Sequence, residues 1–171
     1  MRAWSESLCT QPSDTMRSFH KFAVGADDVQ REIIDAVHDA GNKVRLSDSA
    51  KAMRVGDIIG RMRNAARGRI ALGDKDLVPV RTHPELWELR WSLRKLGKFR
   101  MYHAEPGGEP DLVALCFHRK DDSSNDAAEI HRLQQEEIDE AAKRYGDGVK
   151  IRWGHVVTVC RACVADIEST L

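Results

Sequence analysis

The sequence predicts an α+β fold, with an N-terminal strand and a helix hairpin packed on a small antiparallel (mixed) sheet, and a C-terminal helix that closes it. Three observations support the prediction. Apolar residues recur at helical spacing in two early segments, three closely spaced segments then have the pattern of strands, and a long charged segment follows them. Closely spaced strands joined by short turns are typical of an antiparallel meander.

The composition limits the class of protein. The chain has 171 residues, enough for one domain, and its 27 Lys and Arg residues balance its 27 Asp and Glu residues. A net charge of zero disfavours a strongly basic nucleic-acid coat protein but allows a local basic face. No apolar run reaches the roughly 20 residues that cross a bilayer, and the N-terminus has no apolar signal segment, so we expect a cytoplasmic protein with no membrane partner.

The first 70 residues are expected to form a strand and two helices. Residues 1–16 are polar and indicate a flexible leader, and residues 17–24 have the pattern of a strand. A helix starts at Asp27, where acidic residues complement the helix dipole, and it ends at an Ala-Gly-Asn sequence. A second helix starts near Ser47 and stops at Gly68.

The rest of the chain is expected to supply the sheet and the closing helix. The segments expected as three strands and a helix are residues 86–93, 98–106, 111–120 and 125–145. The run from Leu112 to Phe117 is almost entirely apolar, which indicates a central strand covered on both faces. Residues 17–148 would then form one domain, and residues 149–171 a C-terminal extension with an edge strand and a short helix.

Alternation along the first two of these strands separates a polar face from an apolar one. Glu88, Arg90 and Ser92 alternate with apolar residues that include Trp87 and Trp91, so the tryptophans are expected in the core. In the next strand the residues expected on the polar face are Lys98, Arg100 and Tyr102.

The cysteines do not predict a metal site. Cys160 and Cys163 form a CxxC pair, but Cys9 and Cys116 are too far apart in the sequence to make the second pair of a zinc site. In a cytoplasmic protein the four residues are expected to be thiols, and we expect no metal and no cofactor.

Three stretches carry a resemblance to a known family. "PVRTHPELWELRW", "GKFRMYHAE" and "DLVALCFHRKDDSSNDAAEIHRLQQ" resemble successive motifs of the RelE/ParE toxin superfamily, in its HigB-like, phage-derived branch. The resemblance covers residues 77–146, and residues 17–70 by the order of elements. It implies a RelE-like fold over residues 17–148 and a toxin of a type II toxin–antitoxin module. RelE- and HigB-like members are mRNA endoribonucleases that act on the ribosome, and a cognate antitoxin, here expected to be a helix-turn-helix protein, neutralises them.

Metal-independent RNA cleavage needs a base for the 2′-hydroxyl, a cation for the charged phosphorane and an acid for the leaving oxygen. Under the resemblance, the candidate catalytic residues are Arg90, Arg100, His118 and Arg119. The candidate RNA-binding residues are Lys98, Tyr102, Lys120, His131 and Arg132. Each of these residues can also be explained by a structural role. Arg90 could form a solvent-exposed ion pair with Glu88, and Arg132 could form one with Glu129.

One departure from the family keeps a second function open. Asp121 and Asp122 stand where the family carries cations, and acids beside the basic cluster repel phosphate. The alternative is a non-catalytic ParE-like or phage accessory protein that acts by binding a protein such as gyrase. The partners expected for the nuclease are the antitoxin, the ribosome and mRNA.

Overall fold

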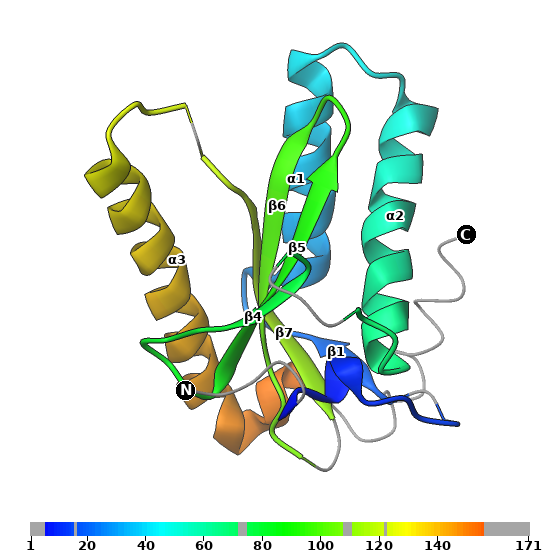
Figure 1. Cartoon of the computed structure of the whole chain (residues 1–171), viewed down its shortest axis with the longest axis vertical. Helices are drawn as coiled ribbons and strands as arrows, with labels where there is room; N and C mark the ends of the chain where they lie inside the picture. Colours follow the sequence, from blue (N-terminus) through cyan, green and yellow to red (C-terminus); the bar gives the residue numbers. More distant parts are fainter. Residues whose placement is uncertain (1–5, 16, 72–74, 108–110, 122, 156–171) are drawn as a thin grey trace.

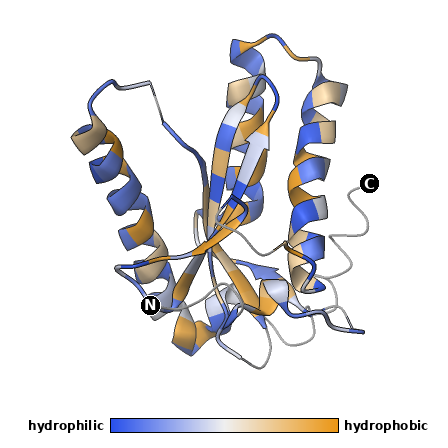
Figure 2. Ribbon diagram, viewed as in Figure 1, coloured by the Kyte–Doolittle hydropathy of each residue, from blue (hydrophilic) through white to orange (hydrophobic). Residues whose placement is uncertain are grey.

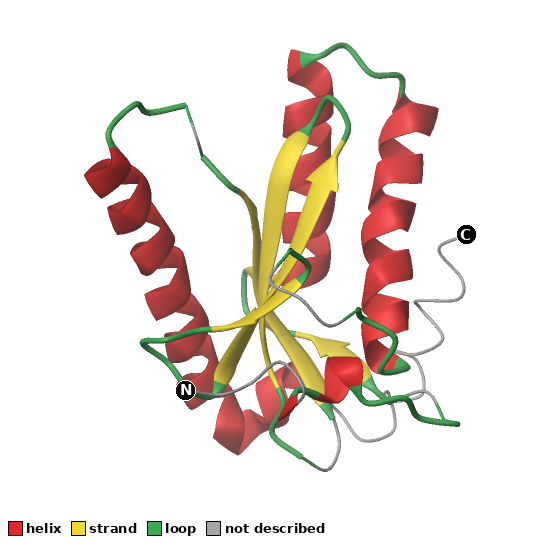
Figure 3. Cartoon of the chain, in the orientation of Figure 1, coloured by secondary structure: helices red, strands yellow, loops and turns green. Residues whose placement is uncertain are grey.

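The computed structural model of the chain describes residues 6–15, 17–71, 75–107, 111–121 and 123–155 (Figure 1). It has a five-stranded mixed sheet with helices α1 and α2 on one side and α3 on the other (Figure 3). The predicted α+β class is therefore confirmed. β7 is predominantly hydrophobic, whereas β5, β6 and the helices mix hydrophobic and hydrophilic residues (Figure 2).

The sheet has the strand order β1-β7-β6-β5-β4. Its strands are β1 (Phe19–Lys21), β4 (Leu77–Pro79), β5 (Leu86–Leu93), β6 (Gly97–Ala104) and β7 (Leu112–Arg119). β5, β6 and β7 form the predicted antiparallel meander, and β1 adds to β7 in parallel. β7 lies between two strands and is buried from Leu112 to Phe117, as its apolar run predicts.

Helices α1 (Val29–Lys43) and α2 (Asp48–Ala66) begin at side-chain caps. The Asp28 carboxylate accepts hydrogen bonds from two backbone N–H groups of α1, and the Ser47 hydroxyl accepts one from α2. Gly68 follows α2 with a φ of 68°, a left-handed conformation that favours glycine. Arg61 of α2 lies over the Trp91 ring, 5.9 Å from its centroid, which places α2 on the tryptophan face of the sheet.

Helix α3 (Ala127–Gly148) packs on the polar face. Asp126 caps it by accepting a hydrogen bond from the Ala128 N–H. The Cys116 thiol of β7 donates to the Glu137 carbonyl oxygen of α3 at 3.6 Å. Helices therefore cover β7 from both sides.

Several shorter elements depart from the sequence prediction. The first strand is divided between β1 and a small hairpin of β2 (Ala23–Val24) and β3 (Asp27–Asp28). Residues 6–15 of the expected leader contain a 3-10 helix, η2 (Leu8–Thr10), in which Cys9 is fully buried.

The edge strand expected within residues 149–171 is not formed by residues 149–154, and the part of the segment after His155 lies outside the described residues. The chain instead forms a 3-10 helix, η3 (Val149–Gly154), whose Trp153 indole donates to the Tyr145 carbonyl oxygen at 3.1 Å. His155 is buried beside His20, with 2.9 Å between their Nδ1 atoms. Apolar content alone did not distinguish a strand from a turn docked on the end of α3. The expected tail helix, Cys160 and Cys163 lie outside the described residues.

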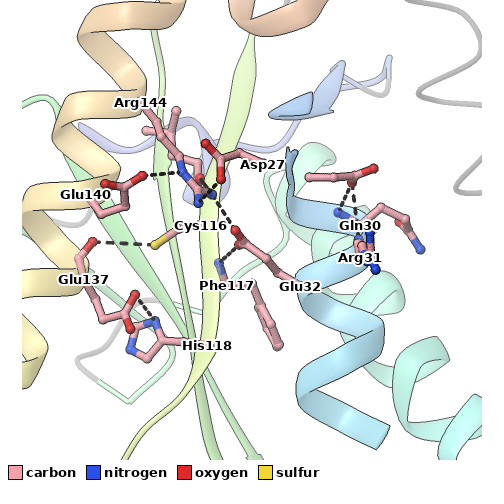
Figure 4. A network of polar contacts seen from close by, with 12 residues as sticks. Asp27, Gln30, Arg31, Glu32, Cys116, Phe117, His118, Glu137, Glu140 and Arg144 are labelled. Atoms are coloured by element: carbon pink, nitrogen blue, oxygen red, sulfur yellow. Dashed lines mark hydrogen bonds and ion pairs between the residues drawn. The ribbon is translucent and has the colours of Figure 1, made fainter. Parts of the chain in front are cut away.

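Arg144 of α3 joins three elements (Figure 4). β1 covers only the first half of one edge of β7, so the second half needs other hydrogen-bond partners. Arg144 donates to the Leu115 carbonyl oxygen at 2.9 Å, and Glu32 of α1 accepts from the Phe117 N–H at 2.8 Å. Arg144 and Glu32 form an ion pair at 2.5 Å, so the two side chains close this edge together. The Arg144 side chain is only 11 % exposed, and it also pairs with Glu140 at 2.9 Å and Asp27 at 3.4 Å.

Across the described ranges, the length and hydropathy needed for a membrane-spanning segment are not found together in any helix.

Replacing Arg144 by Met is expected to lower the free energy of unfolding by about 2–4 kcal/mol, because Glu32 and the Leu115 carbonyl would stay buried without their cation. Urea unfolding monitored by circular dichroism measures the change. Arg132→Met is the matched control, since that side chain pairs with two glutamates but is 54 % exposed. The control is expected to leave the unfolding midpoint nearly unchanged. Equal losses in both variants would contradict the role given to Arg144.

Candidate functional site

The strand register aligns the polar side chains in rows across the sheet. Arg90 of β5 lies opposite Arg100 of β6, and Arg100 lies opposite His118 of β7. Neighbouring rows pair Glu88 with Tyr102 and Ser92 with Lys98. The structure thus brings together Arg90, Lys98, Arg100 and Tyr102 on the face that the sequence predicted, and it adds His118 to the same row.

Glu88 organises the two arginines of this row. Its side chain is 3 % exposed, and its Oε1 atom accepts a hydrogen bond from Arg90 Nε at 2.7 Å and lies 3.1 Å from Arg100 Nη1. The Gln134 amide of α3 donates to Glu88 Oε2 at 3.4 Å. The predicted pair of Arg90 and Glu88 exists, but its carboxylate is buried and is shared with Arg100. A buried carboxylate between two guanidiniums fixes where both cations point.

His118 lies at the end of the row beneath α3. Its ring stacks on Tyr102 with 5.6 Å between centroids, and its Nδ1 atom is 3.7 Å from Glu137 Oε2. Burial, with a contribution from the Arg100 charge, lowers the pKa of His118 to about 4. The imidazole is therefore neutral at pH 7.

Two adjoining hollows open on this face. A cleft of about 240 Å³ between the end of β7 and α3 is lined by residues that include Arg100, His118 and Lys120. A second hollow of about 530 Å³ extends over β5 and β6 and also contacts Arg100 and Lys120. We call the continuous surface the basic groove; its cationic and imidazole residues are Lys75, Arg90, Lys98, Arg100, His118, Arg119 and Lys120.

The acidic residues of the basic groove lie mainly on its α3 side. Glu136 and Glu137 of α3 line the cleft, together with Asp121. Asp76, in the second hollow, is paired with Arg61 at 2.7 Å. An anion is therefore expected to bind nearer to β5 and β6 than to α3.

Arg119 does not belong to the row with His118, which corrects the sequence prediction. Consecutive strand residues point to opposite faces, so Arg119 lies on the Phe99 side of the sheet. Its Nε atom donates to the Leu96 carbonyl oxygen at 2.8 Å, and its guanidinium lies beside Gly97 in the turn between β5 and β6. Arg119 therefore stabilises the turn between β5 and β6, and it borders the cleft without sharing the row of Arg100 and His118.

Tyr102 also differs from its predicted role in RNA binding. The side chain is fully buried, and burial together with the Glu88 charge raises the pKa of its hydroxyl. The buried Tyr102 ring packs against the His118 ring and has no exposed face on which an RNA base could stack.

His131 and Arg132 lie outside the basic groove. Both are exposed on α3, and neither contributes to the lining of the two hollows. Arg132 is held by Glu129 at 2.7 Å and by Glu136, the helix-surface pairing that the sequence offered as its structural explanation.

Asp121 has a local structural role. Its carboxylate accepts hydrogen bonds from the Ser123 N–H at 2.9 Å and from the Ser123 hydroxyl at 2.6 Å, and these contacts lower its pKa. The acid that interrupts the basic sequence thus stabilises the turn that leads into α3. Asp122 lies outside the described residues.

Sequence reasoning missed Glu88, Gln134 and Glu137 as parts of the site. Glu88 gave a signal, because it is an acid on the polar face of a strand next to two arginines. Gln134 and Glu137 gave none, since a charged surface helix has many equivalent positions.

Comparison of the chain with protein-family models, with curated proteins and with solved structures gives no match.

Stability is expected to fall as the pH drops from about 6.5 to about 4, because the pKa values of His118 and His20 are both lowered from 6.5 to about 4. Over that pH interval the two histidines take up protons in the unfolded chain but not in the folded chain. The free energy of unfolding is therefore highest above pH 6.5 and falls as the pH drops toward 4. His118→Gln should flatten the curve of unfolding free energy against pH by on the order of 2 kcal/mol. His131→Gln removes an exposed imidazole from α3 and should keep the wild-type slope. An unchanged slope in His118→Gln would contradict the buried, neutral state of His118.

Proposed function

We propose that the basic groove binds RNA and that the protein is a toxin of a type II toxin–antitoxin module, a ribosome-dependent mRNA endoribonuclease whose cleavage step uses no metal. The observation that carries the proposal is the row of Arg90, Arg100 and His118, with the buried Glu88 holding both arginines. It combines a neutral imidazole with positioned cations, which are two of the three groups that phosphodiester cleavage requires; solvent supplies the acid.

His118 acts as the base. It accepts the proton of a 2′-hydroxyl, and the 2′-oxygen attacks the adjacent phosphorus. Arg100 and Arg90 stabilise the negative charge of the phosphorane. The bond from phosphorus to the 5′-oxygen breaks, and that oxygen takes a proton from solvent. The products are a 2′,3′-cyclic phosphate and a 5′-hydroxyl end.

Glu88 positions the arginines and does not contact the substrate. Because it is almost fully buried, it holds the guanidiniums in place before the substrate binds, which saves reorganisation in the transition state. The phosphate reaches His118 when the Gln134 amide moves away from Glu88, and their hydrogen bond is long at 3.4 Å. Lys98 and Lys120 bind neighbouring phosphates.

The topology supports a RelE-like fold as part of the proposal. A helix hairpin precedes an antiparallel meander, and a long helix follows the last strand, which matches the implied order in part; the β2–β3 hairpin and β4 are additional elements. A cognate antitoxin, the ribosome and mRNA are the proposed partners.

Arg100→Ala and His118→Gln are each expected to reduce mRNA cleavage at least about 100-fold, because they remove the phosphorane cation and the base. Glu88→Gln should also reduce cleavage by loosening the arginine pair. The measurement is primer extension on a translated mRNA with purified ribosomes, with the chemistry of the new ends determined. Arg132→Ala is the matched control and should retain activity.

New 5′-hydroxyl ends that depend on His118 support the proposal. Wild-type protein that arrests growth without cutting mRNA would instead favour the non-catalytic alternative that binds a protein such as gyrase. Full activity in a folded His118→Gln variant would show that the assigned base is wrong.

Lys98→Ala is expected to weaken binding of a labelled single-stranded RNA and to reduce the slope of log affinity against log salt concentration by about 0.7, since one phosphate contact is lost. Lys143→Ala removes one exposed charge from α3, away from the basic groove, and should leave the slope unchanged. Fluorescence anisotropy across a salt series measures both. Equal slopes for all three proteins would exclude Lys98 from the RNA contact.

A further inference from the structure

Three side chains that the proposed nuclease does not use converge at the opposite end of β6. Cys9 Sγ lies 3.4 Å from His103 Nε2 and 3.8 Å from Glu105 Oε1, and the last two atoms are 3.4 Å apart. Cys9 belongs to η2, whereas His103 and Glu105 lie at the end of β6, so residues more than 90 positions apart meet here. Cys9 and His103 are fully buried, and the Glu105 side chain is 5 % exposed.

The separations match those of a tetrahedral metal site. Tetrahedral bonds of about 2.3 Å from zinc to sulfur and about 2.0–2.1 Å to nitrogen or oxygen hold ligand atoms about 3.3–3.6 Å apart. The three observed distances lie within 0.2 Å of this range. The three ligand atoms all lie within 4.8 Å of one another, so a single ion can contact all three.

Neighbouring groups orient the carboxylate. Glu105 Oε2 accepts a hydrogen bond from the Leu8 N–H at 3.0 Å, which leaves Oε1 directed toward Cys9 and His103. The Ser7 hydroxyl donates to Oε1 at 2.5 Å and accepts from the Cys9 N–H at 3.1 Å. Contacts of this kind outside the ligand set hold metal-binding carboxylates in place.

We propose that Cys9, His103 and Glu105 bind a divalent transition metal, with zinc as the ion that suits them best. A thiolate, an imidazole and a carboxylate are all zinc ligands, and the thiolate disfavours magnesium and calcium. The two negative ligands balance the charge of the ion, so the buried site is neutral overall. A water molecule or the Ser7 hydroxyl supplies the fourth ligand.

The same residues do not suit nucleophilic catalysis. A cysteine nucleophile needs access to substrate, whereas Cys9 is fully buried. In a catalytic triad the acid binds the imidazole nitrogen that faces away from the nucleophile. Here Cys9 and Glu105 both face His103 Nε2, an arrangement that fits a shared metal ion.

The site is structural and ties the N-terminal segment to the sheet. The segment already contacts the loop after α2, where the Ile70 N–H donates to the Cys9 carbonyl oxygen at 2.9 Å. A metal ion adds covalent-like bonds between η2 and the end of β6, and these bonds exist only in the folded chain. Metal binding is therefore expected to stabilise the fold.

Cobalt titration of the full chain, stripped of metal with a chelator, tests the proposal. Co²⁺ bound through a thiolate in tetrahedral geometry gives a sulfur-to-metal charge-transfer band and intense visible bands. The wild type is expected to show both with Co²⁺, and Zn²⁺ should abolish them by displacement. Cys9→Ser should abolish the charge-transfer band, and Glu105→Gln should weaken Co²⁺ binding at least about tenfold.

Two matched variants separate this site from the other thiols. Cys116→Ser removes the second buried thiol, which lies near His118 and Glu137, and a Cys160→Ser/Cys163→Ser variant removes the CxxC pair. Both should keep the Cys9-dependent band. Its absence from the wild type, its persistence in Cys9→Ser or its loss in Cys116→Ser would overturn the assignment.

Thermal unfolding gives a second readout in case Cys9→Ser folds poorly. Zn²⁺ at a hundredfold excess over its dissociation constant should raise the Tm of the wild type by roughly 5–10 °C. The Glu105→Gln variant, whose fold is checked by circular dichroism, should show a clearly smaller rise at the same Zn²⁺ concentration. An equal rise in both proteins would contradict the role of Glu105 as a ligand.

Discussion

The ion pair between Arg144 and Glu32 is the contact on which the arrangement of the layers depends. It lies at the part of the β7 edge that β1 leaves open, and it replaces the missing strand with a guanidinium and a carboxylate. Because the two side chains come from α3 and α1, the same contact sets the position of both helices relative to β7. The position of α3 in turn brings Gln134 to Glu88 and Glu137 to His118.

The polar face is buried at its centre and open at its rim. Glu88 and Arg100 are nearly inaccessible, whereas Lys98 is exposed. Burying a carboxylate costs several kcal/mol unless cations compensate it, and Glu88 has two. A pair of arginines that shares one carboxylate keeps a net positive charge, so the centre of the basic groove stays attractive to anions in a chain of zero net charge.

β6 connects two sites of different chemistry. Arg100 belongs to the row with His118, and His103, three residues later, points to the opposite face and meets Cys9. A register shift between Tyr102 and His103 separates the two regions of the strand. A substitution in the proposed RNA-binding groove is therefore expected to leave the proposed metal site intact, and the reverse is also expected.

The sequence alone determined the features that neighbouring residues decide. The helix starts near Asp27, Ser47 and residue 125, the meander of β5 to β7 and the polar faces of β5 and β6 all follow from local chemistry and from the period of two along a strand. Tertiary structure decided which polar residues are buried and which distant ones meet. Glu88 binds Arg100 only through strand register, and Cys9 reaches His103 across 94 positions, a separation over which no local pattern carries information. The contact of Arg119 with the Leu96 carbonyl oxygen was also decided by tertiary structure, although the place of Arg119 beside His118 in the sequence suggested a shared site.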